Sequence, residues 1–214
     1  MLNARPSQAG VSLIELMIGL TIMALLIMIG LPNMATWLSN SQIRTAGETM
    51  LAGLTLARTE AVRRNQIVRF QMVNNLTSGC VISTSGTDWV VSMDDATGAC
   101  DAAASDPAPA DPPPRLIQKR SGSEGTQRAV VAAATAGTLH FNGLGRVTSP
   151  GGAANMTQLN ISNPTGGACE NKDGSGGPMR CLQINISVGG EVRMCDPAVD
   201  PLLFPTDPRL CPVP

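Results

Sequence analysis

Residues 10–31, GVSLIELMIGLTIMALLIMIGL, form the most informative segment of the sequence for the fold. From Val11 onward it is apolar almost throughout, and Glu15 is its single charged residue. At ~1.5 Å per residue, a helix over residues 11–31 is about 30 Å long, which matches the hydrocarbon thickness of a bilayer. Arg5 and the α-amine precede this run. We therefore expect the N-terminus to stay in the cytoplasm and the rest of the chain to cross the membrane.

A secretory signal peptide explains this segment less well. Such signals have a shorter apolar region followed by a small-x-small cleavage site, whereas Leu31 is followed by Pro32 and Asn33. A plain signal anchor accounts for the length but not for Glu15. A carboxylate at the centre of a spanning helix costs roughly 2.5–3.5 kcal/mol, and less near an interface. The acid therefore needs a partner, which indicates a functional role.

The run Gly10-Val11-Ser12-Leu13-Ile14-Glu15 closely resembles the type III signal of type IV pilins and type II secretion pseudopilins. The resemblance implies that a prepilin peptidase cuts between Gly10 and Val11 and methylates the new α-amine of Val11. It also implies that Glu15 pairs with that amine on a neighbouring subunit. Val11 departs from the phenylalanine that is usual in this family. The pairing has a physical reason, because an amine of reference pKa ~7.7–8 neutralises a carboxylate that is costly near the membrane.

A second, amphipathic half of the helix is predicted beyond the apolar run. Gly30 and Pro32 predict a kink or local melting between the halves. Apolar residues then recur at three- and four-residue spacing and form one stripe that can pack against a domain: Met34, Leu38, Ile43, Ala46, Met50, Leu54, Ala57 and Ala61. With Asn65 as its end, the helix over residues 11–65 would run ~80 Å.

The end of this helix carries a more specific match. LARTEAVRRN, residues 56–65, resembles the "LARSEAIRRN" segment of one family branch, the GspH pseudopilins and the minor pilins of the FimT/FimU type. Arg58, Arg63 and Arg64 have two interpretations: a solvated helix end, where cations are favoured by the helix dipole, or a partner-binding surface. Glu60 is spaced to pair with Arg63 or Arg64.

The pattern changes to a strand period after residue 66. Strands are expected at residues 67–73, 88–93, 115–119, 138–142, 157–161, 181–187 and 191–195, separated by Asn- and Gly-rich turns. The segments between these strands show no helical pattern, so the strands predict a mainly antiparallel β head. The fold class is therefore α+β, with a long N-terminal helix packed on this head. The resemblance implies the same type IV pilin-like plan.

The domain organisation follows from these segments. It comprises a leader (1–10), a transmembrane half-helix (11–31), an amphipathic half-helix (32–65) and a head (66–214) with a disulfide-tied tail. Within the head, residues 101–114 (DAAASDPAPADPPP) predict an extended, mobile loop.

Six cysteines lie in the head and none before it: Cys80, Cys100, Cys169, Cys181, Cys195 and Cys211. The head is expected outside the cytoplasm, so disulfides are expected there. Sequential pairing (Cys80–Cys100, Cys169–Cys181 and Cys195–Cys211) is favoured among 15 possible connectivities, because each pair closes a short Gly/Pro-rich loop. Zinc is the alternative, but there is no C-x-x-C motif and only one histidine.

Composition excludes several classes of protein. The net charge of −1 offers no basic excess for bulk nucleic-acid binding, and 2% aromatic residues offer few stacking platforms.

No catalytic constellation appears, so we predict neither an enzyme nor a metal or cofactor site. Asp94 and Asp95 are interpreted as a solvated loop pair and His140 as a strand side chain. Trp89 is interpreted as a core anchor.

The resemblance implies a minor type IV pilin of the FimT/FimU type that helps to initiate a pilus near its tip. Its partners would be other pilins or pseudopilins, prepilin peptidase, the inner-membrane assembly platform and inner-membrane lipid. It would move from the bacterial inner membrane, with a periplasmic head, into a pilus or pseudopilus fibre. The first alternative is a GspH-like pseudopilin of type II secretion, and the least likely one is an anchored periplasmic enzyme.

A further alternative is a DNA-binding tip subunit for DNA uptake. Such pilins resemble one another in a Gly-Arg-x-Arg motif that contacts phosphates. The matching segment, Gly190-Glu191-Val192-Arg193, keeps only its second arginine. Glu191 would repel phosphate. Arg193 and Arg146 are therefore the candidate DNA contacts.

Overall fold

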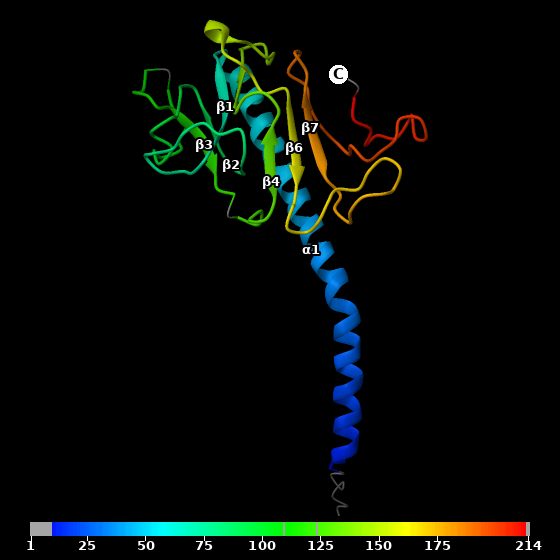
Figure 1. Cartoon of the computed structure of the whole chain (residues 1–214). Coiled ribbons are helices and arrows are strands. Elements are labelled where there is room, and N and C mark those ends of the chain that lie inside the picture. Colours follow the sequence, from blue (N-terminus) through cyan, green and yellow to red (C-terminus); the bar gives the residue numbers. More distant parts are fainter. Residues whose placement is uncertain (1–9, 109, 123, 213–214) are drawn as a thin grey trace, which may run out of the picture. The chain divides into compact units, whose positions relative to one another are not determined.

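The computed structural model describes residues 10–108, 110–122 and 124–212, except for the side chains of residues 29–33. It divides into two compact units, Met1–Trp37 and Leu38–Pro214, which are described separately below. The elements in chain order, labelled in Figure 1, are α1 (Leu13–Arg64), β1 (Val68–Val73), β2 (Asp88–Ser92), β3 (Leu116–Arg120), β4 (Val130–Ala133), β5 (Thr138–Phe141), the 3-10 turn η1 (Pro150–Gly152), β6 (Gln158–Ser162), β7 (Leu182–Ile186) and β8 (Val192–Cys195).

The first unit consists of the N-terminal part of α1. The Leu16 amide donates a hydrogen bond to the Ser12 carbonyl (3.1 Å), which starts the helix. Large apolar side chains from Leu13 to Met28 are between 48% and 77% exposed. Over the described residues, no helix combines the length and apolarity needed to cross a membrane. The kink predicted at Gly30 and Pro32 falls where side chains lie outside the described residues, so it stays a prediction.

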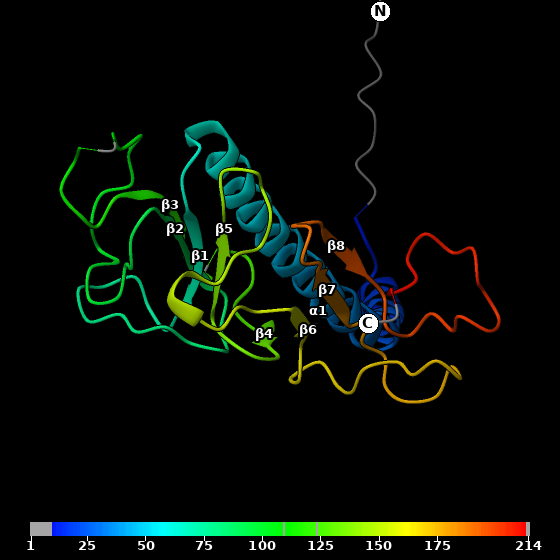
Figure 2. The ribbon, with the colours of Figure 1, turned by 90° about the horizontal axis from the view of Figure 1, so that it is seen from above.

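The second unit contains two four-stranded antiparallel sheets. Their strand orders are β3-β2-β1-β5 and β4-β6-β7-β8. Figure 2 shows the C-terminal half of α1 running alongside both sheets. Each sheet is built from strands that are close in sequence, as in the β7–β8 hairpin, where Ile184 faces Met194. The first sheet also takes in β5, which pairs with β1 through Phe70 and Leu139.

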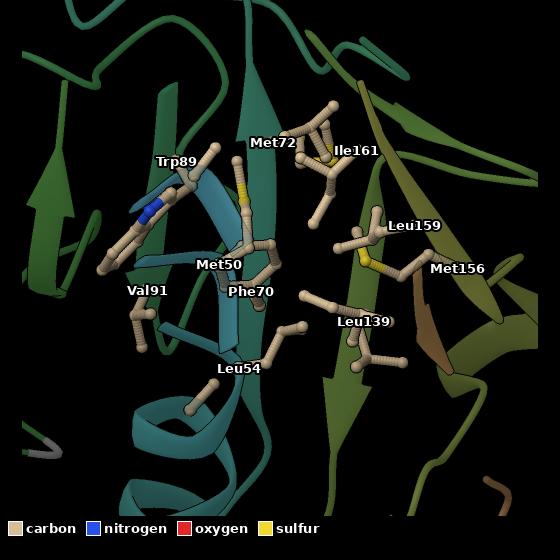
Figure 3. Close-up of a cluster of buried hydrophobic side chains, with 14 of the residues drawn as sticks. Met50, Leu54, Phe70, Met72, Trp89, Val91, Leu139, Met156, Leu159 and Ile161 are labelled. Carbon is tan, nitrogen blue, oxygen red and sulfur yellow. The ribbon is translucent and has the colours of Figure 1, made fainter. Parts of the chain in front are cut away.

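The core lies between α1 and the two sheets. Six members of the predicted stripe are fully buried: Ile43, Ala46, Met50, Leu54, Ala57 and Ala61. They share one cluster with Phe70 and Trp89 from the first sheet and with Leu159 and Ile161 from the second (Figure 3). The Trp89 side chain is 2% exposed, and its ring lies 5.6 Å from that of Phe70. Trp89 is therefore the core anchor that the sequence predicts.

The stripe begins later than predicted. Met34 is 58% exposed and Leu38 is 51% exposed, so these two residues do not contribute to the buried face. Ile43, in the second turn of α1 within the second unit, is the first stripe residue to be covered by the core cluster.

Glycines let the helix approach the sheets closely. A Cβ atom added at Gly53 would lie 2.8 Å from Phe70 Cε2 and 3.0 Å from Trp89 Cζ2. One added at Gly47 would lie 2.8 Å from the Met194 sulfur. Such distances are below van der Waals contact, so side chains larger than hydrogen would push the helix from both sheets.

The predicted α+β plan is confirmed, and seven of the strands lie within two residues of their predicted bounds. β4 was not predicted. Its sequence, VVAA, is half alanine, which is depleted in strands. β4 forms because it pairs with β6, with Val131 opposite Ile161, and this pairing is not evident from the sequence of β4.

Candidate functional site

The segment around the predicted cleavage point is exposed. Gly10, Val11 and Ser12 precede the helix outside regular structure, and Glu15 lies in its first turn. Ser12 and Glu15 have the Ser-x-x-Glu spacing typical of a capping box, which favours a helix start here. Within the described residues, no hydrogen bond or ion pair of the Glu15 carboxylate is found. This carboxylate is therefore free to accept a cation from another molecule.

At the other end of α1, arginines bind the chain's own carboxylates. Glu60 accepts hydrogen bonds from Arg63 Nη2 and Arg64 Nε, both at 2.8 Å. Both arginines also pair with Asp106, and Arg64 donates to the Pro107 carbonyl. Burial alone would raise the Glu60 pKa, but the hydrogen bonds from Arg63 and Arg64 bring it below its usual value.

This network corrects two expectations. The Arg64 side chain is 10% exposed and is an internal structural feature, whereas the Arg63 side chain is 52% exposed and lies at a solvated helix end. The loop 101–114, predicted to be mobile and linker-like, is attached to the helix end through Asp106. The spacing of Glu60 from Arg63 and Arg64 predicts part of this network. The pairing with Asp106 could not be predicted, because Asp106 is 42 residues from Arg64.

The two candidate DNA-contact arginines lie on neighbouring segments, Arg146 beside the turn after β5 and Arg193 in β8. A Cβ added at Gly190 would lie 1.9 Å from the Gly145 carbonyl oxygen, so the turn before Glu191 touches the turn that carries Arg146. Arg146 is exposed. Arg193 is also exposed, but its Nη2 donates to the Pro208 carbonyl at 2.8 Å.

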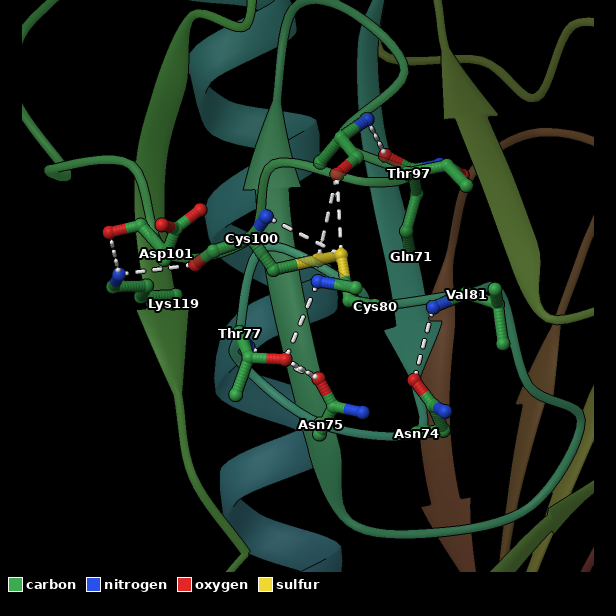
Figure 4. Close-up of a disulfide and its surroundings, with 12 residues drawn as sticks. Gln71, Asn74, Asn75, Thr77, Cys80, Val81, Thr97, Cys100, Asp101 and Lys119 are labelled. Atoms are coloured by element: carbon green, nitrogen blue, oxygen red, sulfur yellow. Dashed lines mark hydrogen bonds between the residues drawn. A yellow bond between two sulfur atoms is a disulfide. The ribbon is translucent and has the colours of Figure 1, made fainter.

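Three disulfides join the pairs expected from the sequence: Cys80–Cys100, Cys169–Cys181 and Cys195–Cys211. Figure 4 shows the first of them with Lys119 nearby, whose ammonium donates to the carbonyls of Cys100 and Asp101. Cys195–Cys211 closes the irregular C-terminal tail onto β8. The described residues contain no group of His, Cys, Asp and Glu side chains arranged to hold a metal ion.

The acidic pair at residues 94 and 95 lies in the loop after β2 with Asp95 exposed, as predicted, but both carboxylates also have partners within the head. Asp94 accepts two hydrogen bonds from the Arg115 guanidinium, at 2.7 and 2.8 Å. These bonds lower the Asp94 pKa. Asp95 accepts from Gln71 Nε2 at 3.0 Å. The local sequence does not indicate these pairings, because Arg115 is 21 residues from Asp94 and Gln71 is 24 residues from Asp95.

Comparison with known proteins decides the family. The family model described as "Type II transport protein GspH" matches residues 46–190, which is more than half of the chain. The chain belongs to the GspH family. A second model, the prokaryotic N-terminal methylation motif, matches residues 5–31 of this GspH-family protein. Membership makes it a minor type IV pilin or pseudopilin.

Two solved structures are similar to this GspH-family protein. Both are crystal forms of the type IV minor pilin FimU from Pseudomonas aeruginosa. One is 16% identical with a TM-score of 0.39, and the match covers 71% of this chain and 90% of that one. The other is 18% identical with a TM-score of 0.38, covering 71% and 87%. No curated protein matches the chain.

Proposed function

We propose that this GspH-family protein is a minor type IV pilin of the FimT/FimU type, processed by prepilin peptidase and placed near the tip of a pilus. The observation that carries the proposal is the joining of a methylation motif (5–31) to a GspH domain (46–190). One helix, α1, runs through both matched regions. It acts by assembly rather than by catalysis.

Assembly in this proposal depends on the first unit. Cleavage after Gly10 frees the α-amine of Val11, which is then methylated. Glu15, exposed and without a partner in the described residues, accepts the amine of a neighbouring subunit. The exposed apolar side chains that surround this part of α1 require cover, and lipid or the helices of other pilins supply it. The head stays in the periplasm until the subunit enters the fibre.

Intact mass tests the processing step. The full-length protein is purified from membranes of a bacterial host with and without prepilin peptidase. With the peptidase, we expect loss of residues 1–10, one added methyl group at Val11, and a gain of six hydrogens on reduction. Gly10→Leu is the matched variant and should stay uncut in both hosts. An uncut natural chain in both hosts would contradict the proposal.

The runner-up function is a GspH-like pseudopilin of type II secretion, which the name of the matching family favours. Deleting the gene in its native host distinguishes the two. Loss of sheared surface fibres with intact protein secretion supports the pilus. Loss of secretion with intact fibres supports the pseudopilus.

DNA binding is the weaker proposal for the head. Arg146 is exposed, but Glu191 is also exposed beside it, and Arg193 is engaged by the Pro208 carbonyl. The Glu191 carboxylate repels a phosphate that approaches these arginines. The arginines therefore neutralise the phosphate less well, and fewer counterions are released on binding. We expect no retention of double-stranded DNA in a gel shift at low salt. Retention that is lost in Arg193→Gln and Arg146→Gln would reverse this expectation.

A further inference from the structure

The outer face of the first sheet, which points away from α1, carries a polar cavity. Alternate residues of β1 and β5 face this side, with Arg69 opposite His140 and Gln71 opposite Thr138. Together with Asp95 they line a cavity of about 430 Å³. Its volume is in the range of small-ligand sites.

Apolar side chains supply the rest of the wall. They are Ile82, Pro150, Ala153 and Ala154, from two loops outside the sheet. A cavity with a polar floor and short apolar walls fits a ligand with one polar head and a small hydrocarbon part.

Two floor residues already have their hydrogen bonds within the head. Gln71 Nε2 donates to Asp95 Oδ1 at 3.0 Å, while its Oε1 accepts from the Ser92 hydroxyl at 3.2 Å and from the Ala96 amide at 3.0 Å. These bonds hold the amide in a fixed orientation. Gln71 therefore has no strong need of a ligand.

His140 is held by Asn155. The Asn155 amide group donates to the Thr148 carbonyl, so its oxygen faces His140 and accepts from His140 Nδ1 at 2.8 Å. Burial lowers the His140 pKa, although the bond to Asn155 opposes this effect. The orientation of the Asn155 amide favours the tautomer of His140 that carries its proton on Nδ1.

Arg69 differs from these residues. Its Nε is buried and has no hydrogen-bond partner, and no ion pair of its guanidinium is found among the described residues. Asp94 and Asp95 lie close enough to Arg69 for its charge to lower the pKa of both carboxyls, but their hydrogen bonds go to other groups, Asp94 to Arg115 and Asp95 to Gln71 and Thr97. A buried donor without a partner costs about 1–3 kcal/mol, and more when it belongs to a charged group. Such a group in a native protein calls for an explanation, and a ligand in the cavity that pairs with the guanidinium is one.

We propose that this cavity binds a carboxylate group through the Arg69 guanidinium. The planar guanidinium matches a carboxylate with two parallel hydrogen bonds. The charges decide between carboxylate and phosphate. Arg69 and Asp95 on the same cavity wall leave it without net charge, so a ligand group with one negative charge is opposed less than a phosphate group, which carries about −1.5 to −2. The carboxylate comes from a free small acid or from an acidic side chain of another protein.

The test uses the fact that His140 is the single histidine of the chain. Full-length protein in detergent micelles is labelled with carbon-13 at histidine Cε1, so that one resonance reports on the cavity. Sodium acetate, the peptide Ac-Ala-Glu-Ala-NH₂ and inorganic phosphate are titrated separately, at constant pH and constant ionic strength. We expect a saturable shift with acetate or with the peptide, and none with the matched peptide Ac-Ala-Gln-Ala-NH₂. Saturation by acetate identifies a free acid as a sufficient ligand, and saturation by the peptide alone identifies a protein side chain.

Three variants link the shift to the cavity. Arg69→Gln should raise the half-saturating concentration at least tenfold, since it loses a charge-assisted pair. Arg146→Gln, which removes an exposed arginine of a different turn, should leave it unchanged. Ala154→Phe narrows the cavity while Arg69 stays in place, and should also weaken binding. This third variant keeps the test valid if Arg69→Gln does not fold.

The proposal is wrong if no probe gives a saturable shift, or if the shift survives in Arg69→Gln. Phosphate saturating at the same concentration as the carboxylate probes would overturn the choice of ligand.

Discussion

Two stretches of the same helix, residues 13–28 and 43–61, differ in what covers them. In the first, large apolar side chains are 48–77% exposed, and they occur on every side of the helix. In the second, one stripe is fully buried by two sheets and the other faces are polar. A helix that is apolar all round is stable only when other molecules cover it, whereas a one-sided helix is completed by its own chain. In the proposed function, assembly depends on the first stretch, and the buried stripe of the second stretch supports folding.

The two carboxylates of α1 make the same contrast. Glu60 has two arginines of its own chain within hydrogen-bond distance. Glu15 is exposed, and no partner is found for it in the described part of the chain. The first acid stabilises the subunit, and the second is available to another subunit.

The largest effect is expected from Glu15→Gln. If Glu15 pairs with a neighbouring α-amine, removing its charge should reduce incorporation into fibres at least tenfold. The free energy of unfolding of the head should stay within ~0.5 kcal/mol of its original value, as for surface substitutions elsewhere. Quantitative immunoblotting of sheared fibres measures the first quantity and urea titration the second. Normal incorporation would remove Glu15 from the assembly mechanism.

Leu54→Ala tests the other stretch. Leu54 is fully buried, so truncation should destabilise the head by about 2–5 kcal/mol through lost burial and a cavity. Leu26→Ala is the matched control, the same substitution on the same helix at a side chain that is 66% exposed. Urea titration of the full chain in micelles should show no more than ~0.5 kcal/mol for the control. Equal losses in both variants would contradict the difference between the two stretches.

Gly53→Ala sharpens the comparison, because alanine is usually favoured over glycine in helices. At residue 53 the new methyl group would meet the Phe70 and Trp89 rings, and overpacking should cost about 1–3 kcal/mol. At Gly19 an added Cβ has no neighbour within 4 Å. Thermal unfolding of the head should therefore shift downward in Gly53→Ala and stay unchanged in Gly19→Ala. An unchanged midpoint for Gly53→Ala would mean that helix and sheet can separate without cost.

The smallest effect is expected from Glu60→Gln. The Glu60 pKa is lower in the folded chain than its ordinary value of ~4.3, so its contribution is present above that pH and is lost as the pH falls through the folded value. We expect a loss of about 1 kcal/mol at pH 7 that shrinks by pH 3.

Urea titrations at the two pH values measure this change. Glu48→Gln is the matched control, since Glu48 pairs with Arg44 on the exposed face of the same helix. Exposed pairs of this kind contribute only ~0.3–0.5 kcal/mol. A loss in Glu60→Gln that is independent of pH would show that the carboxylate charge is not what stabilises the helix end.

The helix, its two halves and most strands could be predicted from the residues alone, because the periodicity of apolar residues is a local property of the chain. The stripe from Ile43 to Ala61 and the alternation at Val68–Val73 can be read without knowing what covers them. The family signature at Gly10–Glu15 is local for the same reason. Three features could not be predicted from the residues and are seen only in the folded chain: strand β4, the attachment of Asp106 to Arg63 and Arg64, and the cavity around Arg69. Each of these depends on groups far apart in the chain, and only the packed fold brings them within hydrogen-bond or van der Waals distance.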